Sequence, residues 1–334
     1  MSLDIYISGD IFNYGFLVYN LLMEKERKDI VVIGATNTDI SGKCLYPLVM
    51  SDSNIGNIST SLGGVGHNIA LNLSHMGKEV SFITSIGSDN FGVNARIELE
   101  NVMDISDSVF FDGPSGVYLY VADEKGEMIV AVNDMSAAKE ITPSFLETKK
   151  EIIESAPFIV LDANLEEESI QYASKTANGI VVCDAVSTLK AGRLVSSFPF
   201  IDILKPNLME LEYLSGVKIT DEKSIRDAGI VLTEKGVGRV VATAGENGAY
   251  YITHNSFLHA YGQKLDVKNT NGAGDSFLSG FVFALSEGLD EKDALKMALS
   301  ASRITIMEEN TVSNNIEGEV LYKLSKEIKV EEVS

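Results

Sequence analysis

The sequence predicts an α/β fold, in which helices cover both faces of a mainly parallel central sheet and a small β lid lies over one edge. Short β-branched runs alternate with segments of helical spacing along most of the 334-residue chain, which is typical of parallel sheets. The alternation is interrupted once, where 116-GVYLYVA-122 and 127-EMIVAVN-133 flank an Asp/Gly-containing turn and predict a β-hairpin. This hairpin and a polar segment predict a lid sheet from about 42–62 and 108–135; an extra edge hairpin with no moving role is the alternative.

The strands of the main sheet are predicted from short apolar runs that end at turn-forming residues. The first is β-branched and ends at a glycine, which is typical of a strand buried on both faces. In chain order, strands are expected at 30–35, 79–87, 157–164, 180–187, 201–207, 239–245 and 249–253. The run 201–207 is short because it meets a proline.

The helices are predicted where apolar residues recur at helical spacing, and several end at a glycine. In chain order, they are expected at 67–77, 90–103, 145–156, 167–178, 208–216, 222–236, 274–288 and 291–307. Residues 30–334 therefore read as one domain. The role of 1–29 is open, because its apolar run could form a helix packed on the body or an oligomer contact.

Composition excludes several classes of protein. The net charge of −21 repels phosphate backbones, so we expect no nucleic-acid partner. No apolar run is long enough to span a bilayer, so we expect no membrane association. Cys44 and Cys183 are far apart and form no CxxC pair, which favours a reducing cytoplasm over a disulfide framework or a zinc site.

The run 269-NTNGAGDSFLSGFVFAL-285 places small residues and a carboxylate at the start of a predicted helix. Free N–H groups at a helix N-terminus bind anions, and glycine allows a phosphate to approach the backbone. Gly272, Ala273 and Gly274 therefore indicate an anion cradle. Asp275 beside it suits a general base that takes a proton from an attacking hydroxyl. The alternative is a glycine turn followed by an acidic residue that only favours the helix dipole.

A second glycine cluster, 61-SLGGVGHN-68, also precedes a helix. It lacks the GxGxxG order of dinucleotide sites, and the chain has no Walker motif. Small residues here would admit a flat, polyhydroxylated ligand. Asn37 and Asp39 are expected at the carboxyl end of the first strand, where open α/β sheets bind ligands, and Asp39 can accept hydrogen bonds from two sugar hydroxyls.

With both motifs in this order and a hairpin between them, the chain resembles the PfkB, or ribokinase-like, family of carbohydrate kinases over about 30–315. The resemblance implies a three-layer α/β/α sandwich with a small β lid and an ATP-dependent transfer to an alcohol. Asp275 would then be the catalytic base, and the backbone N–H groups of 272–274 would stabilise the transferring phosphoryl group.

The resemblance also implies binding roles. Asn207 and Glu210 match an Asn-x-x-Glu segment tied to Mg²⁺, and a monovalent cation such as K⁺ is possible for the family, although Asn269 replaces a frequent aspartate. The nucleotide would be bound by Asn207, Thr243, Gly245, Gly248 and Asn271. The acceptor would be bound by Asn37, Asp39, Asp52, Asn54, Gly63, Gly64, Val65, Asn68 and Asn133.

Within the family, 52-DSNIGNISTSLGGVGHNIALNLSHMG-77 is similar to pseudouridine kinases, which implies the 5′-hydroxyl of pseudouridine as the acceptor. Ile55 stands where those enzymes usually have proline, and His67 where they have arginine. A kinase for ribose, another sugar or an ordinary nucleoside is the first alternative. A catalytically silent sensor of a small ligand is the second, and a regulator that carries a remnant of a DNA-binding module in 1–29 is the third. The exposed edges of the lid predict a homodimer through the lid.

Overall fold

The computed structural model describes residues 29–265, 267–308 and 310–333. The segment 1–29, whose role the sequence leaves open, therefore lies outside the described residues except for Asp29.

A nine-stranded sheet forms the centre of the described chain, in the order β15-β14-β13-β12-β11-β10-β9-β1-β4. Six neighbouring strands are parallel: β4 (Val80–Ile83), β1 (Ile30–Ile33), β9 (Phe158–Asp162), β10 (Ile180–Asp184), β11 (Ile203–Lys205) and β12 (Arg239–Thr243). Three antiparallel strands complete one side: β13 (Ala249–Ile252), β14 (Phe257–Tyr261) and β15 (Lys329–Glu332). The prediction of a mainly parallel sheet is confirmed, but β14 and β15 were not predicted.

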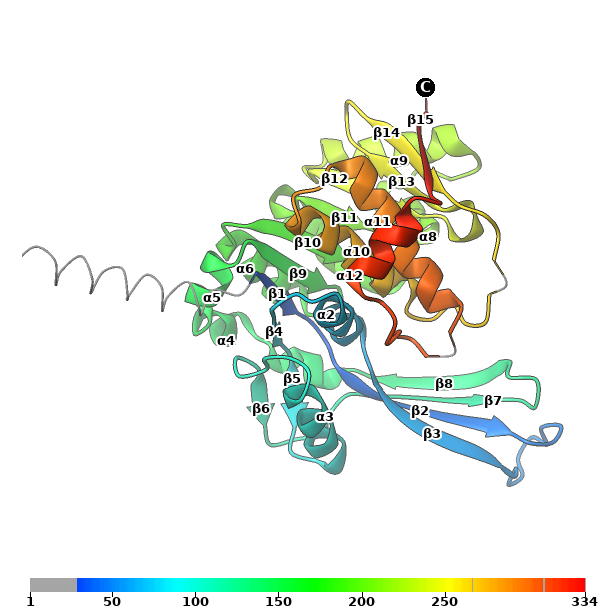
Figure 1. The fold of residues 1–334 in the computed structure, drawn as a ribbon. Coiled ribbons are helices and arrows are strands. Elements are labelled where there is room, and N and C mark those ends of the chain that lie inside the picture. Colours follow the sequence, from blue (N-terminus) through cyan, green and yellow to red (C-terminus); the bar gives the residue numbers. More distant parts are fainter. Residues whose placement is uncertain (1–28, 266, 309, 334) are drawn as a thin grey trace, which may run out of the picture.

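Side chains alternate along each strand, so the sheet separates two hydrophobic cores. In β1, Ile30 and Val32 belong to one core, while Val31 and Ile33 belong to the other. The first core contains α2 (Val65–His75), α3 (Asn90–Glu100), α10 (Ala273–Ser286), α11 (Glu291–Ile306) and α12 (Gly318–Ser325). The second contains α4 (Pro143–Glu147), α5 (Lys150–Ser155), α6 (Glu167–Thr176), α7 (Thr188–Ala191), α8 (Leu208–Ser215) and α9 (Glu222–Glu234). Figure 1 shows the resulting three layers.

Two predicted elements are divided in the structure. The strand expected at 79–87 ends at Ile83 and resumes as β5 (Ser85–Gly87), which pairs with β6 (Val109–Phe111) in a separate small sheet. Ser108 marks the break, because its hydroxyl accepts from the Thr84 N–H and donates to the Phe82 carbonyl. The helix expected at 145–156 is split into α4 and α5, because the Thr148 hydroxyl donates a hydrogen bond to the Phe145 carbonyl oxygen at the break.

The lid is a four-stranded sheet in the order β3-β2-β7-β8 that extends from the body (Figure 1). Its strands are β2 (Asn37–Cys44), β3 (Gly56–Gly63), β7 (Val117–Ala122) and β8 (Met128–Asp134). The antiparallel pairing of β7 with β8 confirms the predicted hairpin. The lid begins at Asn37 rather than near 42, and Val109–Phe111 belongs to the small β5–β6 sheet instead.

Candidate active site

Polar residues end four neighbouring parallel strands. Asp162 ends β9, Asp184 ends β10, Lys205 ends β11 and Thr243 ends β12. Because parallel strands end at the same edge of a sheet, these side chains share one side of the molecule. Of these four residues, only Thr243 was predicted from the sequence to be a site residue. A charged residue directly after a buried apolar run was the signal available for the others.

The start of α10 faces this edge and has the geometry of an anion site. Gly272 is the N-cap with φ 75°, and a Cβ there would lie 2.0 Å from the Thr311 carbonyl oxygen, so only glycine fits. No side chain caps the helix. The backbone N–H groups of Gly274 and Asp275 belong to the first turn, where a helix offers no internal acceptor. They are available to an anion, which the helix dipole also favours.

Asp275 is buried in this first turn and contacts the other glycine motif. Asn68 Nδ2 donates to Asp275 Oδ2 at 2.7 Å, across 207 residues of sequence. Burial and the nearby Asp184 carboxylate raise the pKa of Asp275 to about 7, while Lys205 and Asn68 act in the lowering direction. A carboxyl group that titrates near neutrality is suited to accept a proton.

His67 orients the amide that contacts Asp275. Its ring Nδ1 lies 3.1 Å from Asn68 Oδ1, and because that oxygen can only accept, Nδ1 carries the proton. Burial lowers the pKa of His67 to about 4, so the ring stays neutral. The sequence singled out His67 only as a departure from arginine, and its link to Asp275 through Asn68 requires the tertiary structure.

The acceptor residues predicted near the glycine pair lie together at the base of the lid. Asn37 pairs with Gly63 across β2 and β3, and the Asn37 amide donates to Asp39. A Cβ on Gly63 would lie 2.2 Å from Asp39 Oδ2, so this glycine makes room for the carboxylate. Gly64, at φ 103°, allows the turn into α2. Burial raises the pKa of Asp39, although the hydrogen bond from Asn37 opposes the shift. Asn37 and Asp39 lie at the start of β2, which is a lid strand. They were expected at the end of the first strand of the main sheet instead.

Three other residues predicted to bind the acceptor substrate make no hydrogen bond to this cluster within the described chain. Asp52 and Asn54 are exposed in the connection between β2 and β3, where the Asn54 side chain binds the backbone of Val49. Asn133 is exposed on β8 and pairs with Tyr118 in register. Their roles remain predictions.

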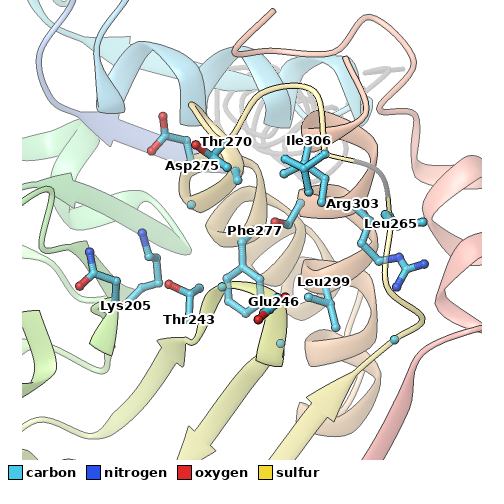
Figure 2. A pocket seen from close by; sticks show the side chains of 18 of the residues that line it. Lys205, Thr243, Glu246, Leu265, Thr270, Asp275, Phe277, Leu299, Arg303 and Ile306 are labelled. Carbon is cyan, nitrogen blue, oxygen red and sulfur yellow. The ribbon is translucent and has the colours of Figure 1, made fainter. Parts of the chain in front are cut away.

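A cavity of about 480 Å³ extends from the start of α10 over the strand ends (Figure 2). Most predicted nucleotide and phosphate residues line it, namely Asn207, Glu210, Thr243, Gly245, Gly248, Ala273, Gly274 and Asp275. Val65, predicted for the acceptor, also lines it. Asn271 is exposed in the preceding loop and does not line the cavity. The lining also includes the apolar side chains of Leu265, Val267, Phe277, Leu299 and Ile306. The cavity therefore combines an anion site with apolar surface.

Asn207 and Glu210 form a capping box at the start of α8. Asn207 Oδ1 accepts from the Glu210 N–H, while both Glu210 carboxylate oxygens accept from Asn207, each at 2.8 Å. Burial raises the pKa of Glu210. Among the described residues, no three His, Cys, Asp or Glu side chains are grouped to hold a metal ion. Because the Glu210 oxygens are already engaged, this site fits Mg²⁺ held through its water shell, which that ion usually keeps.

Comparison with known proteins identifies the family of the whole chain. The pattern of the pfkB family carbohydrate kinases matches residues 27–317. The chain belongs to the PfkB family. A pseudouridine kinase from Escherichia coli (strain K12) is 31% identical over 292 residues, which cover 86% of this chain and 93% of that protein. A guanosine-inosine kinase from Exiguobacterium acetylicum is 28% identical over 283 residues, with 82% and 92% covered.

Solved structures agree on the fold. A ribokinase from Thermotoga maritima superimposes with a TM-score of 0.80 over 90% of this PfkB chain and 99% of that protein, at 24% identity. The predicted ribokinase-like three-layer fold is confirmed. The protein is thus an ATP-dependent phosphotransferase that acts on the hydroxyl of a sugar or nucleoside. Within the described residues, no helix is both long enough and apolar enough to cross a bilayer.

Proposed function

We propose that this PfkB kinase phosphorylates the 5′-hydroxyl of pseudouridine, with Asp275 as the general base. The observation that carries the mechanism is the position of Asp275. Its carboxylate is buried at the first turn of α10, beside free backbone N–H groups, and is hydrogen-bonded to Asn68 of the second glycine motif. A base and an anion site thus lie within one helical turn, which suits the activation of an alcohol beside a phosphate.

Each half of the site has a distinct task in this mechanism. Asn37, Asp39 and the Gly63–Gly64 backbone would bind the acceptor, whose primary hydroxyl gives its proton to Asp275. The hydroxyl oxygen forms a bond to the γ-phosphorus as the bond to the ADP oxygen breaks, and the N–H groups of the α10 first turn bind the transferring group. The lid would limit access of water and hence hydrolysis of ATP.

Mg²⁺ fits beside Glu210 and Asn207, where it would neutralise phosphate charge. The contribution of the chain is a fixed carboxylate, because the capping box holds Glu210 in place. We propose K⁺ activation only as an accessory feature, since Asn269 replaces the aspartate frequent in the family and its side chain accepts from the Asn271 N–H at 3.0 Å.

Pseudouridine is favoured over other acceptors by the similarity of 52–77 to pseudouridine kinases and by the 31% identity with the Escherichia coli enzyme. The guanosine-inosine kinase at 28% identity makes an ordinary nucleoside the second candidate. His67 is the residue that best distinguishes pseudouridine from an ordinary nucleoside as the acceptor, because it replaces the arginine usual in pseudouridine kinases. A buried neutral ring cannot supply the charged fork of donors that arginine would.

An acceptor screen tests this proposal. ADP release would be measured with ATP, Mg²⁺ and each of pseudouridine, uridine, guanosine, inosine, adenosine, ribose and common hexoses. We expect the highest kcat/KM with pseudouridine. A higher value with any other acceptor would overturn the substrate assignment and leave the kinase assignment intact. No ADP release with any acceptor would instead favour the silent sensor. The Asp275→Asn variant controls for a contaminating kinase.

We also propose that the kinase forms a homodimer through its lid. β3 and β8 are the outer strands of the lid, and every residue of β8 is exposed. The exposed fractions of Ile58, Val130 and Val132 are 78%, 54% and 61%. Such an open apolar edge favours pairing with a second copy of the same surface. Sedimentation of the full chain should give the mass of a dimer, and Val130→Lys with Val132→Lys should give a monomer. A monomeric wild type would contradict the proposal.

The proposed partners are small molecules only. Four carboxylates line the cavity against three cationic side chains, and the net charge of the chain is −21, so extended nucleic acid would be repelled. We propose the cytoplasm as the compartment, since the thiols of Cys44 and Cys183 are free and buried.

A further inference from the structure

Lys205 is a buried cation in the cavity that has no role in the mechanism described so far. It ends β11, is only 6% exposed and lines the cavity together with Gly274 and Asp275. Figure 2 shows Lys205 and Asp275 projecting into the same space from facing elements. Burying an ammonium group is costly, so a buried lysine needs carboxylate partners or a functional reason.

Asp184 fixes the position of the ammonium group. The two residues are neighbours in register at the ends of β10 and β11, and Lys205 Nζ lies 2.8 Å from Asp184 Oδ2. Both side chains are almost fully buried. The ion pair therefore holds the ammonium group in one position on a rigid pair of strands.

The ammonium group lies at the first turn of α10. A Cβ placed on Gly274 would be 2.8 Å from Lys205 Nζ, closer than such atoms approach in proteins. Gly274 therefore leaves the space that the ammonium group occupies. Two features that attract anions meet here: free backbone N–H groups of a helix start and a fixed positive charge.

We propose that Lys205 is a further catalytic residue, whose ammonium group binds the phosphoryl group during transfer. Asp184 is a positioning residue that aims it. The proposal rests on the proposed phosphate site at α10. The charge on the transferring group is spread over its outer oxygens. A fixed donor beside them therefore stabilises the transition state more than it stabilises the complex with ADP.

Lys205→Met removes the charge and keeps the chain length, so it tests the proposal directly. We expect kcat to fall by about 10²–10³-fold, the cost of removing one such donor. The Kd for ADP should change less than about twofold, whereas the ADP–aluminium fluoride complex, which mimics the transferring group, should bind at least about tenfold more weakly. Lys149→Met is the matched control, because Lys149 forms a half-buried ion pair with Asp107 at 3.0 Å and does not line the cavity. It should leave all three values unchanged.

The single variant leaves Asp184 without its cation, so it could lose stability for structural reasons alone. The double variant Lys205→Met with Asp184→Asn restores neutrality and separates the two effects. We expect its melting temperature to recover toward wild type while kcat stays at least about 10²-fold low. Recovery of kcat to within about threefold of wild type would show that the pair is only structural and would overturn the proposal.

The fluoride measurement needs no acceptor, so the two proposals can fail independently. If pseudouridine is not phosphorylated but Lys205→Met weakens the ADP–aluminium fluoride complex, the acceptor is wrong and Lys205 is supported. If pseudouridine is phosphorylated and that complex binds Lys205→Met as well as wild type, the role of Lys205 is refuted.

Discussion

The two halves of the active site are built differently. The phosphate half lies in the body, where Asp275, Lys205 and Glu210 are buried between packed elements and bound by close partners. The acceptor half starts at the buried base of the lid, with Asn37, and continues toward β3 and β8, where consecutive residues are exposed on both faces. In the proposed mechanism, the transfer chemistry is therefore fixed by the core, whereas acceptor selection would depend on a thin sheet with little packing behind it.

The two halves meet where Asn68 donates a hydrogen bond to Asp275. Substitutions in the body should therefore reduce turnover, and substitutions in the lid should weaken acceptor binding. The predictions that follow test this division and the pKa of Asp275 on which it depends.

Asp275→Asn should have the largest effect, lowering kcat by about 10³–10⁴-fold by removing the base, with the KM for ATP nearly unchanged. Steady-state kinetics measures both. The matched control is Asp293→Asn, since Asp293 also lies in the first turn of a helix but pairs with Lys296 at the surface. Near-normal turnover by Asp275→Asn would show that the body does not supply the base.

Asn68→Leu should lower kcat by about 10–10²-fold, because the Asp275 carboxylate loses a buried donor. The same bond lowers the pKa of Asp275, so its loss should move the acid limb of the pH profile to higher pH. Asn72→Leu is the control, because it is one turn later on α2 and its amide has no partner among the described residues. A shift in the control equal to that of Asn68→Leu would refute a specific link between the halves.

The wild-type enzyme should gain activity with pH because the deprotonated carboxylate is the active form. Its kcat/KM should rise between about pH 6 and pH 8, with a midpoint near 7, where Asp275 titrates. Stability should run in the opposite direction. Ionising Asp275 costs more free energy in the folded protein, where its pKa is about 7, than in the unfolded chain, where the ordinary pKa is 3.8. The contribution of the protonated carboxyl group to stability is therefore complete below about pH 4 and is lost as the pH rises through 7.

Asp275→Asn removes this penalty and should melt a few degrees higher than wild type at pH 8, with a smaller difference at pH 5. Calorimetry at both values measures it. A variant that is less stable at pH 8 would contradict the raised pKa of the carboxyl group.

Lid substitutions should have the smallest effect on turnover. Asp39→Asn should raise the acceptor KM by about 10-fold, because a charged acceptor of sugar hydroxyls becomes neutral. Asn133→Ala should raise it only about threefold, since an uncharged hydrogen bond from an exposed strand is weak. Neither should change the KM for ATP. A loss of kcat in Asn133→Ala comparable to Asn68→Leu would break the division, because it would place chemistry on the lid.

Much of the fold followed from local patterns in the sequence. Alternating strands and helices predicted the parallel sheet, and the Asp/Gly-containing turn predicted the β7–β8 hairpin. Boundaries failed where side chains competed with the backbone, as Ser108 does at the break between β4 and β5. The strand 329–332 was missed because its pairing with 257–261 joins distant segments, whereas 257–261 itself also pairs with the adjacent strand 249–252 in a local hairpin that was overlooked.

The sequence by itself determined where glycine is needed and which helix start holds a carboxylate, because caps, turns and periodicity depend on a few consecutive residues. Only the tertiary structure decided what that carboxylate meets. Asn68 and Asp275 are 207 residues apart, and Lys205 reaches Gly274 from another strand. Burial, which moves the pKa of Asp275 toward neutrality, is likewise a property of the packed core, because it is produced by residues brought together from the whole chain.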